Sequence, residues 1–293
     1  MIILIFKGSY ALLLATEVFQ MVYFHYFVNQ TLPYNFSNFL INLKYLNFQF
    51  LPNPLSVTVP ENYSSAATPT AFVLAITDTT FFISCGHYFL VLAFYAVWAM
   101  AVAILKNKGI NKWDKLRRFC RNVFQRRIRF GAINEAFWFC YISFVFFGFW
   151  QLRDLNTSTG WNIANLITAF FFLFVCFFIT CWVIYLSLKY REDVTKVPKK
   201  HQFILGEDSH IPFEIALRHI RKLLFCAFLA IGKIETQVMA IMAANFMVLA
   251  YYLFYKPSKS RLSNWVNILI ELSYMGLEIT LLAFVNKVSL TTD

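Results

Sequence analysis

Two glutamates near the C-terminus, Glu271 and Glu278, lie in a stretch that is otherwise mostly apolar. Because they are seven residues apart, a helix would place both carboxylates on the same face, two turns apart. Tyr274 lies between them, and Asn267 lies one turn before Glu271. A polar stripe of this kind must face protein or water, since an ionised side chain at the centre of a membrane helix costs roughly 2.5–3.5 kcal/mol or more.

This stripe has two interpretations, and the residues alone leave both open. In the first, a cation path runs beside Glu271, Glu278, Asn267 and Tyr274. In the second, the two acids form hydrogen bonds or ion pairs with neighbouring helices, and Arg221 or Lys233 is the expected partner. Further ionisable residues inside apolar runs are Glu17, His87 and Glu135.

Long apolar runs predict the elements that carry these side chains. The chain is 59% hydrophobic and only 14% charged, whereas soluble domains are about 45–50% apolar and about 25% charged. A run of about 20 apolar residues is long enough to cross a bilayer. The sequence therefore predicts an all-α polytopic transmembrane helix bundle, with residues 1–293 as a single domain. About seven spans are expected, at about 8–28, 81–105, 132–151, 163–188, 216–232, 238–255 and 265–286.

The distribution of Lys and Arg predicts which side each loop faces. If the N-terminus is cytoplasmic, the inside segments 106–130, 189–222 and 256–264 hold 21 of the 26 Lys and Arg residues. The positive-inside rule therefore predicts a cytoplasmic N-terminus and one long outer segment, 29–80. The first apolar run extends past residue 25 and lacks a signal peptide's basic start, so it predicts an uncleaved first span.

The loop 106–130 holds ten Lys or Arg residues and a single acid, Asp114. Apolar residues recur at helical spacing between the cations, which is typical of an interfacial helix on anionic lipid, with about 1 kcal/mol from each basic side chain. A calmodulin-like partner is the alternative. Nucleic acid is not expected, because basic nucleic-acid patches sit on polar soluble domains. The expected lipid-binding residues are Lys112, Lys115, Arg117, Arg118, Arg121, Arg126 and Arg127.

Four N-x-S/T tripeptides all fall in segments that the charge rule places outside. Asn29 is too close to the bilayer to be used, so the expected glycan sites are Asn35, Asn62 and Asn156. Their common placement favours the plasma membrane or another membrane of the secretory pathway. The mitochondrial inner membrane is the alternative.

No pattern typical of an enzyme appears in the chain. There is no GxSxG, Walker A or kinase signature, and the six cysteines and five histidines have neither CxxC nor HExxH spacing. The loop ILGEDSHIPFE groups several acids and histidines, and a solvated loop is the simpler interpretation. We therefore expect no enzyme activity, no cofactor and no metal site.

The stretches EVFQMVYFHYFVNQTLPYNFSNFL, RFGAINEAFWFCYISF, PFEIALRHIRKLLFCAFL and TQVMAIMAANFMVLAYYLFYKPSKSRLSNWVNILIE span most of the chain. They resemble the membrane region of a large group of protist proteins, abundant in ciliates, with a TRP-like or polycystin-like C-terminal block. The resemblance implies a channel-like membrane protein. The long cysteine-rich extracellular region of larger members is absent, so the chain is a short paralogue or a fragment. The family's recurring positions would be Arg218, Arg221, Gln237, Lys256, Pro257 and Glu271.

These observations predict a TRP-like channel or transport protein that moves cations. The alternative is a non-enzymatic structural or accessory subunit of a membrane complex. Against a channel, the connections 232–237 and 255–262 are too short to hold a re-entrant pore loop. The expected partners are membrane lipids, anionic on the cytoplasmic side, and further copies of the chain or a larger membrane complex.

Overall fold

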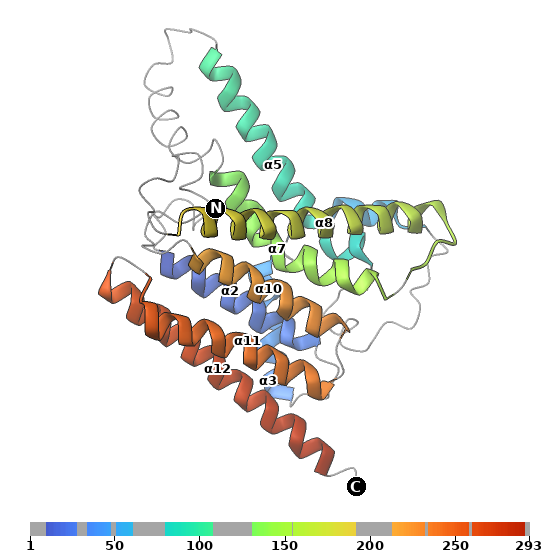
Figure 1. The fold of residues 1–293 in the computed structure, drawn as a ribbon. Helices are drawn as coiled ribbons and strands as arrows, with labels where there is room; N and C mark the ends of the chain where they lie inside the picture. The colour runs from blue at the N-terminus through green and yellow to red at the C-terminus, as the bar shows by residue number, and fades with distance from the viewer. Residues whose placement is uncertain are drawn as a thin grey trace.

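The computed structural model describes residues 10–27, 34–47, 51–60, 80–107, 131–153, 155–191, 213–231, 234–257 and 260–290. Within these ranges the chain is all α, with eight α-helices and three short 3-10 helices (Figure 1). The α-helices are α2 (Tyr10–Phe24), α3 (Tyr34–Asn42), α5 (Phe81–Asn107), α7 (Gly131–Gln151), α8 (Gly160–Lys189), α10 (Phe213–Ile231), α11 (Ile234–Tyr255) and α12 (Arg261–Leu290). The 3-10 helices are η1 (His25–Phe27), η2 (Leu43–Asn47) and η3 (Pro54–Thr58).

A helix lies at the position of each apolar run that the sequence analysis singled out. Three stretches within α8, α11 and α12, at Gly160–Lys189, Gln237–Tyr255 and Arg261–Ala283, are long and apolar enough to cross a membrane. In α5 and α7 the apolar stretches among the described residues are shorter, at Phe81–Phe94 and Cys140–Gln151. The all-α class is therefore confirmed, and the described part of the chain has three candidate membrane spans.

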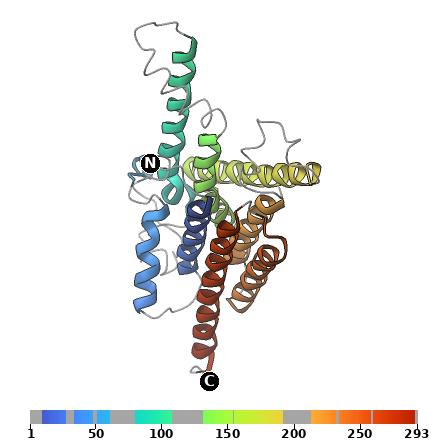
Figure 2. The same ribbon diagram turned by 90° about the vertical axis from the view of Figure 1, so that its left-hand side faces the viewer.

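The order of helices in space brings the two ends of the sequence together. The last helix, α12, packs against both α11 and the first helix, α2, while α10 packs against α7, α8 and α11. Figures 1 and 2 show α2, α10, α11 and α12 grouped together, with α5 and α12 extending toward opposite ends of the molecule. Side chains from α2 and from the last third of the chain therefore share one interior.

Aromatic rings make up much of the core. Phe144 of α7 contacts both Phe81 of α5 and Phe172 of α8, with ring centroids 5.7 and 4.5 Å away, and the latter two rings also stack at 6.0 Å. Phe24 of α2 meets Phe146 on another face of α7 at 4.9 Å. Such pairs contribute about 0.5–1.5 kcal/mol beyond the apolar area that they bury. These ring contacts hold α7 against α2, α5 and α8.

Asn53 connects the segment before α5 to that helix, and Gly86 leaves the room for it. Its Nδ2 donates to the carbonyl oxygens of Phe82 at 3.0 Å and Ile83 at 2.7 Å, and its Oδ1 accepts from the Leu55 amide. A Cβ at Gly86 would lie 2.7 Å from Asn53 Nδ2 and closer still to Oδ1.

The variant Gly86→Ala should therefore push Asn53 out of these bonds and lower the free energy of unfolding by about 1–3 kcal/mol. Thermal unfolding in detergent measures the loss. Gly276→Ala on α12 is the matched control, since no atom lies within 4 Å of a Cβ there, and alanine favours the helix. Equal stability of the two variants would contradict the contact.

Candidate functional site

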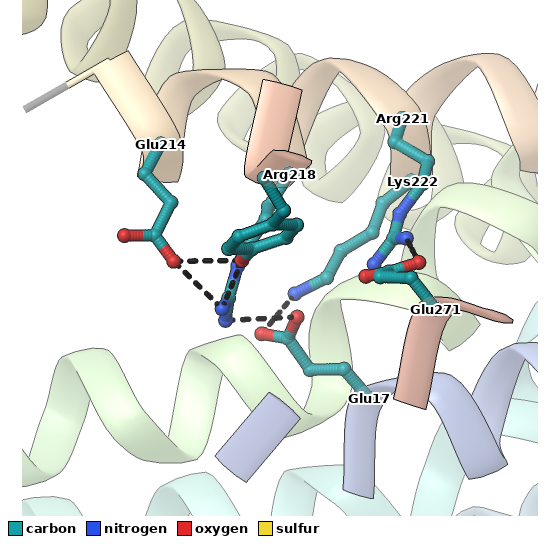
Figure 3. A network of polar contacts seen from close by, with 7 residues as sticks. Glu17, Glu214, Arg218, Arg221, Lys222 and Glu271 are labelled. Atoms are coloured by element: carbon teal, nitrogen blue, oxygen red, sulfur yellow. Dashed lines mark hydrogen bonds and ion pairs between the residues drawn. The ribbon is translucent and has the colours of Figure 1, made fainter. Parts of the chain in front are cut away.

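Three basic side chains of α10, Arg218, Arg221 and Lys222, are buried inside the bundle, each at most 1% exposed. Residues three and four positions apart share a helix face, so one side of α10 carries all three charges. They reach partners on α2, α11 and α12 (Figure 3). A buried charge is stable only when it is paired or hydrogen-bonded, so these partners decide what the cluster is.

Glu17 of α2 forms ion pairs with two of the three cations. Lys222 Nζ lies 2.6 Å from Glu17 Oε1, and Arg218 Nη1 lies 3.9 Å from Glu17 Oε2. Figure 3 shows the carboxylate pointing up between the two basic side chains. Glu17 thus connects the first described helix to α10 by charge.

Arg218 has further partners on its own helix and on α11. Its Nη2 donates to Glu214 Oε1 at 2.9 Å, one turn earlier, and its Nε donates to the Tyr252 hydroxyl at 2.9 Å. The same hydroxyl donates to Glu214 Oε1 at 2.7 Å. Arg218, Glu214 and Tyr252 therefore form a closed triangle of hydrogen bonds.

Removing the Tyr252 hydroxyl tests that triangle. Tyr252→Phe keeps the ring and takes away two hydrogen bonds from Arg218 and one to Glu214, so we expect a loss of roughly 1.5–3 kcal/mol in the free energy of unfolding. Tyr255→Phe on the same helix is the control, because its side chain is 63% exposed. Unfolding curves that coincide for the two variants would show that the triangle contributes nothing.

Arg221 pairs with Glu271, one of the two carboxylates of the predicted stripe. Arg221 Nη1 lies 2.5 Å from Glu271 Oε2, and neither side chain is more than 1% exposed. The pair joins α10 to α12, as Figure 3 shows. Of the two partners expected for this acid, Arg221 is the one that the structure supplies, while Lys233 lies outside the described residues.

The predicted stripe of α12 does face the interior of the protein. Asn267 and Glu271 are fully buried, Tyr274 and Glu278 are 1% exposed, and Leu269 on the other face is 59% exposed. The stripe thus faces protein, one of the two surroundings predicted for it. A cation path beside it stays a prediction.

Glu278 lies in a separate group from the ionic cluster of α10. Asn245 of α11 donates its side-chain amide to Glu278 Oε1, and His25 Nε2 of η1 lies 3.7 Å from the same oxygen. The second oxygen, Oε2, is buried without a hydrogen-bond partner in the part of the chain that the structure describes. Two turns of α12 thus hold one acid that is neutralised by an arginine and one that is not.

The charges of the α10 cluster balance. Its three cations are matched by the carboxylates of Glu17, Glu214 and Glu271, which the structure also buries. We refer to these six residues, with Tyr252, as the ionic network. Replacing buried ion pairs by apolar residues is often neutral or stabilising by about 1–4 kcal/mol, so stability alone does not require this arrangement.

The other residues singled out from the sequence are distributed as follows. His87 Nε2 donates to the carbonyl oxygen of Asn47 at 2.9 Å and so has a backbone partner. Asn35 and Asn156, two of the expected glycan sites, are exposed. Outside the described residues lie Asn62 and the seven lipid-binding candidates, Lys112, Lys115, Arg117, Arg118, Arg121, Arg126 and Arg127. The side chain of Glu135 is likewise outside the described part.

Sequence reasoning missed several members of the site. Glu214 ends the loop ILGEDSHIPFE, for which a solvated loop was the simpler interpretation, but the structure buries it in the first turn of α10. Lys222 was not singled out. Both lie four residues from Arg218 and thus on the same helix face. His25 and Asn245 carried no signal of their own, because a lone histidine and a lone asparagine in apolar runs have no characteristic spacing.

Among the described residues, no group of three or more His, Cys, Asp or Glu side chains is placed to hold a metal ion. Comparisons with protein-family models, with curated proteins and with solved structures find no match to this chain.

Proposed function

We propose that this integral membrane protein crosses its membrane about seven times and moves cations. In this proposal, the ionic network and Glu278 are the residues that carry out transport. The proposed spans are α2, α5, α7, α8, α10, α11 and α12, with the N-terminus in the cytoplasm. The resemblance to TRP-like protist membrane proteins supports the same class. The glycan sites Asn35 and Asn156 fit a membrane of the secretory pathway, and the basic loop 106–130 fits contact with anionic lipid.

The burial of seven charged side chains in one bundle is the observation that carries this proposal. Glu17, Glu214, Glu271 and Glu278 are each at most 1% exposed, as are the three cations of α10. Charged residues inside membrane bundles characteristically belong to ion pathways, proton relays or voltage sensors. A bundle held together only for stability would use close apolar packing and neutral hydrogen bonds instead.

Within this group Glu278 is the acid best suited to meet a cation. Glu271 is held by Arg221 at 2.5 Å, so a passing cation would have to displace a guanidinium. Glu278 has an amide and an imidazole beside it and, among the described residues, no Lys or Arg side chain paired with it. The proposed pathway therefore centres on Glu278, with the Arg221–Glu271 pair as a closed barrier beside it.

The short helix connections favour a carrier over a channel with a selectivity filter. Helix α10 ends at Ile231 and α11 begins at Ile234, and α11 ends at Tyr255 with α12 beginning at Arg261. Filters of the TRP kind need a re-entrant segment between two helices, and these connections have no room for one. Rearrangement of α10 against α2 and α12 is the proposed alternative, because the ion pairs join those helices.

Cation flux into liposomes that contain the purified full chain tests the proposal. Glu278→Gln should reduce the flux at least about tenfold, equivalent to about 1.4 kcal/mol in the barrier, while the protein stays folded. Ser273→Ala is the matched control on α12, since this serine is exposed and its hydroxyl donates to the carbonyl oxygen of Leu269 in its own helix. Flux from folded wild-type protein no greater than from empty liposomes overturns the proposal.

An accessory or structural subunit is the second candidate, and the outward face of α8 favours it. The whole length of this helix exposes large apolar side chains that lie away from α5, α7 and α10. Such a surface suits either lipid tails or a helix of another membrane protein. Absence of flux from a folded chain would make this candidate the better one. The exposed residues are Ile163, Ile167, Phe170, Phe171, Phe174, Phe177, Phe178, Trp182, Tyr185 and Leu188.

A further inference from the structure

Glu278 stands out because the described interior holds one more carboxylate than it holds Lys and Arg side chains. Glu17, Glu214 and Glu271 are matched by Arg218, Arg221 and Lys222, as their contacts show. The fourth acid, Glu278, is 1% exposed. An ionised carboxylate at such a depth is very costly unless a positive charge or a proton neutralises it, so its neighbours have to supply one.

The ring of His25 is held in a known orientation beside Glu278. His25 Nδ1 lies 2.9 Å from the carbonyl oxygen of Met21. Because a carbonyl oxygen can only accept, Nδ1 must carry a hydrogen. In the neutral ring the other nitrogen, Nε2, is then a bare acceptor. This nitrogen is the one that faces Glu278 Oε1, at 3.7 Å.

Two acceptors that face each other in a dry interior make a place for one proton. With Glu278 ionised and His25 neutral, Nε2 and Oε1 present lone pairs to each other. A proton taken from water binds either to Nε2, giving an imidazolium beside a carboxylate, or to the carboxylate, giving a carboxylic acid that can donate to Nε2. Both forms hold one proton and are neutral as a pair.

Among the described residues, the remaining surroundings place no second charge against the pair and do not suit a metal ion. Asn245 of α11 contributes a neutral amide, and Phe225 of α10 covers the His25 ring with centroids 5.2 Å apart. Tyr274 of α12 lies edge-on to His25 at 5.7 Å and is within electrostatic range of Glu271, Arg221 and Glu278. Calcium takes six to eight oxygen ligands, and this group offers few.

From this geometry we infer that His25, Glu278 and Asn245 form a buried site that binds a single proton between η1 and α12. Asn245 fixes the carboxylate by donating to it, and Met21 fixes the ring by accepting from Nδ1. The proton is the ligand, and its arrival or departure changes the attraction between α2 with its η1 extension and α12. The site is defined by these contacts alone and does not rest on cation transport.

Nuclear magnetic resonance of the ¹⁵N-histidine-labelled full chain in lipid bicelles, with infrared detection of protonated carboxylic acid, tests the inference. In the wild-type chain we expect one proton in the pair across the neutral pH range, seen either as a doubly protonated His25 or as a carboxylic acid signal that Glu278→Gln removes. His87 serves as an internal control, because its Nε2 faces a carbonyl oxygen of Asn47 and not an acid.

The variant Glu278→Gln distinguishes a site that binds a proton from a contact in which His25 and Glu278 only pack together. Without the carboxylate the pair can no longer share a proton, so a doubly protonated His25 ring seen in the wild type at neutral pH should become singly protonated, while the His87 signal stays in place. A doubly protonated His25 ring that persists unchanged in Glu278→Gln overturns the inference. If that variant does not fold, the wild-type spectra still decide, since an ionised Glu278 beside a neutral His25 throughout the range contradicts a bound proton. Neither result depends on whether the chain shows cation flux.

Discussion

A Glu271→Leu variant will lose about 3–5 kcal/mol of folding stability, because it leaves the buried guanidinium of Arg221 without its carboxylate. The two groups are 2.5 Å apart and at most 1% exposed, so water cannot take the place of the missing anion. Arg221→Met should lower the folding stability by a similar amount, because it leaves the buried carboxylate of Glu271 without its cation. Denaturant or thermal unfolding in mixed micelles measures both single variants.

The double variant Arg221→Met/Glu271→Leu is the decisive control. With both charges gone, we expect most of the lost stability to return, to within about 1 kcal/mol of the wild type or better, as for other buried pairs replaced by apolar residues. The interaction energy follows from the double-mutant cycle. Additive losses in the double variant would show that the two side chains do not pair. Leu272→Ala on the outward face of α12 reports the effect of an unrelated change, since this residue is 48% exposed.

Glu17→Gln will destabilise the bundle by a comparable amount, about 3–5 kcal/mol, because it strands the buried ammonium of Lys222. Lys222 Nζ lies 2.6 Å from Glu17 Oε1, and Lys222 is fully buried. Arg218 also loses an anion at 3.9 Å but keeps Glu214 and Tyr252. The same unfolding measurements apply, with helix content checked by circular dichroism.

Rescue of Glu17→Gln should come from a change on α10. Lys222→Met removes the stranded charge, so Glu17→Gln/Lys222→Met should regain most of the stability, whereas Arg218→Met in its place should not. The Arg218 substitution would strand Glu214 instead, which lies 2.9 Å from the guanidinium. A Lys222→Met substitution that fails to rescue would mean that Lys222 does not depend on Glu17.

The elements of the fold follow from the sequence more closely than the contacts between them. Long apolar runs predicted helices where α5, α7, α8, α10, α11 and α12 lie, because a membrane helix must satisfy its own backbone groups and so has a local signature. Charged residues within an apolar run make a membrane helix harder to recognise from the sequence. Helix α10 carries Arg218, Arg221 and Lys222, and it is not among the three candidate spans.

The orientation of the α12 stripe was predictable, since Asn267, Glu271, Tyr274 and Glu278 repeat at spacings of four, three and four residues. The partners were harder, because an ion pair between helices leaves no spacing rule in one sequence. Arg221 was one of two suggested partners for Glu271. No local pattern connects Glu17 to Lys222 or His25 to Glu278, and only the packing of α2 against α12 brings the latter pair together.

The bond between Glu17 and Lys222 also sets an order of events during synthesis, since the two residues are 205 positions apart in the chain. At about 5–20 residues per second, the ribosome needs roughly 10–40 s to make the segment between them. Throughout that interval the first helix carries a carboxylate whose lysine partner does not yet exist. Helix α2 can therefore form this ion pair only after α10 has been synthesised.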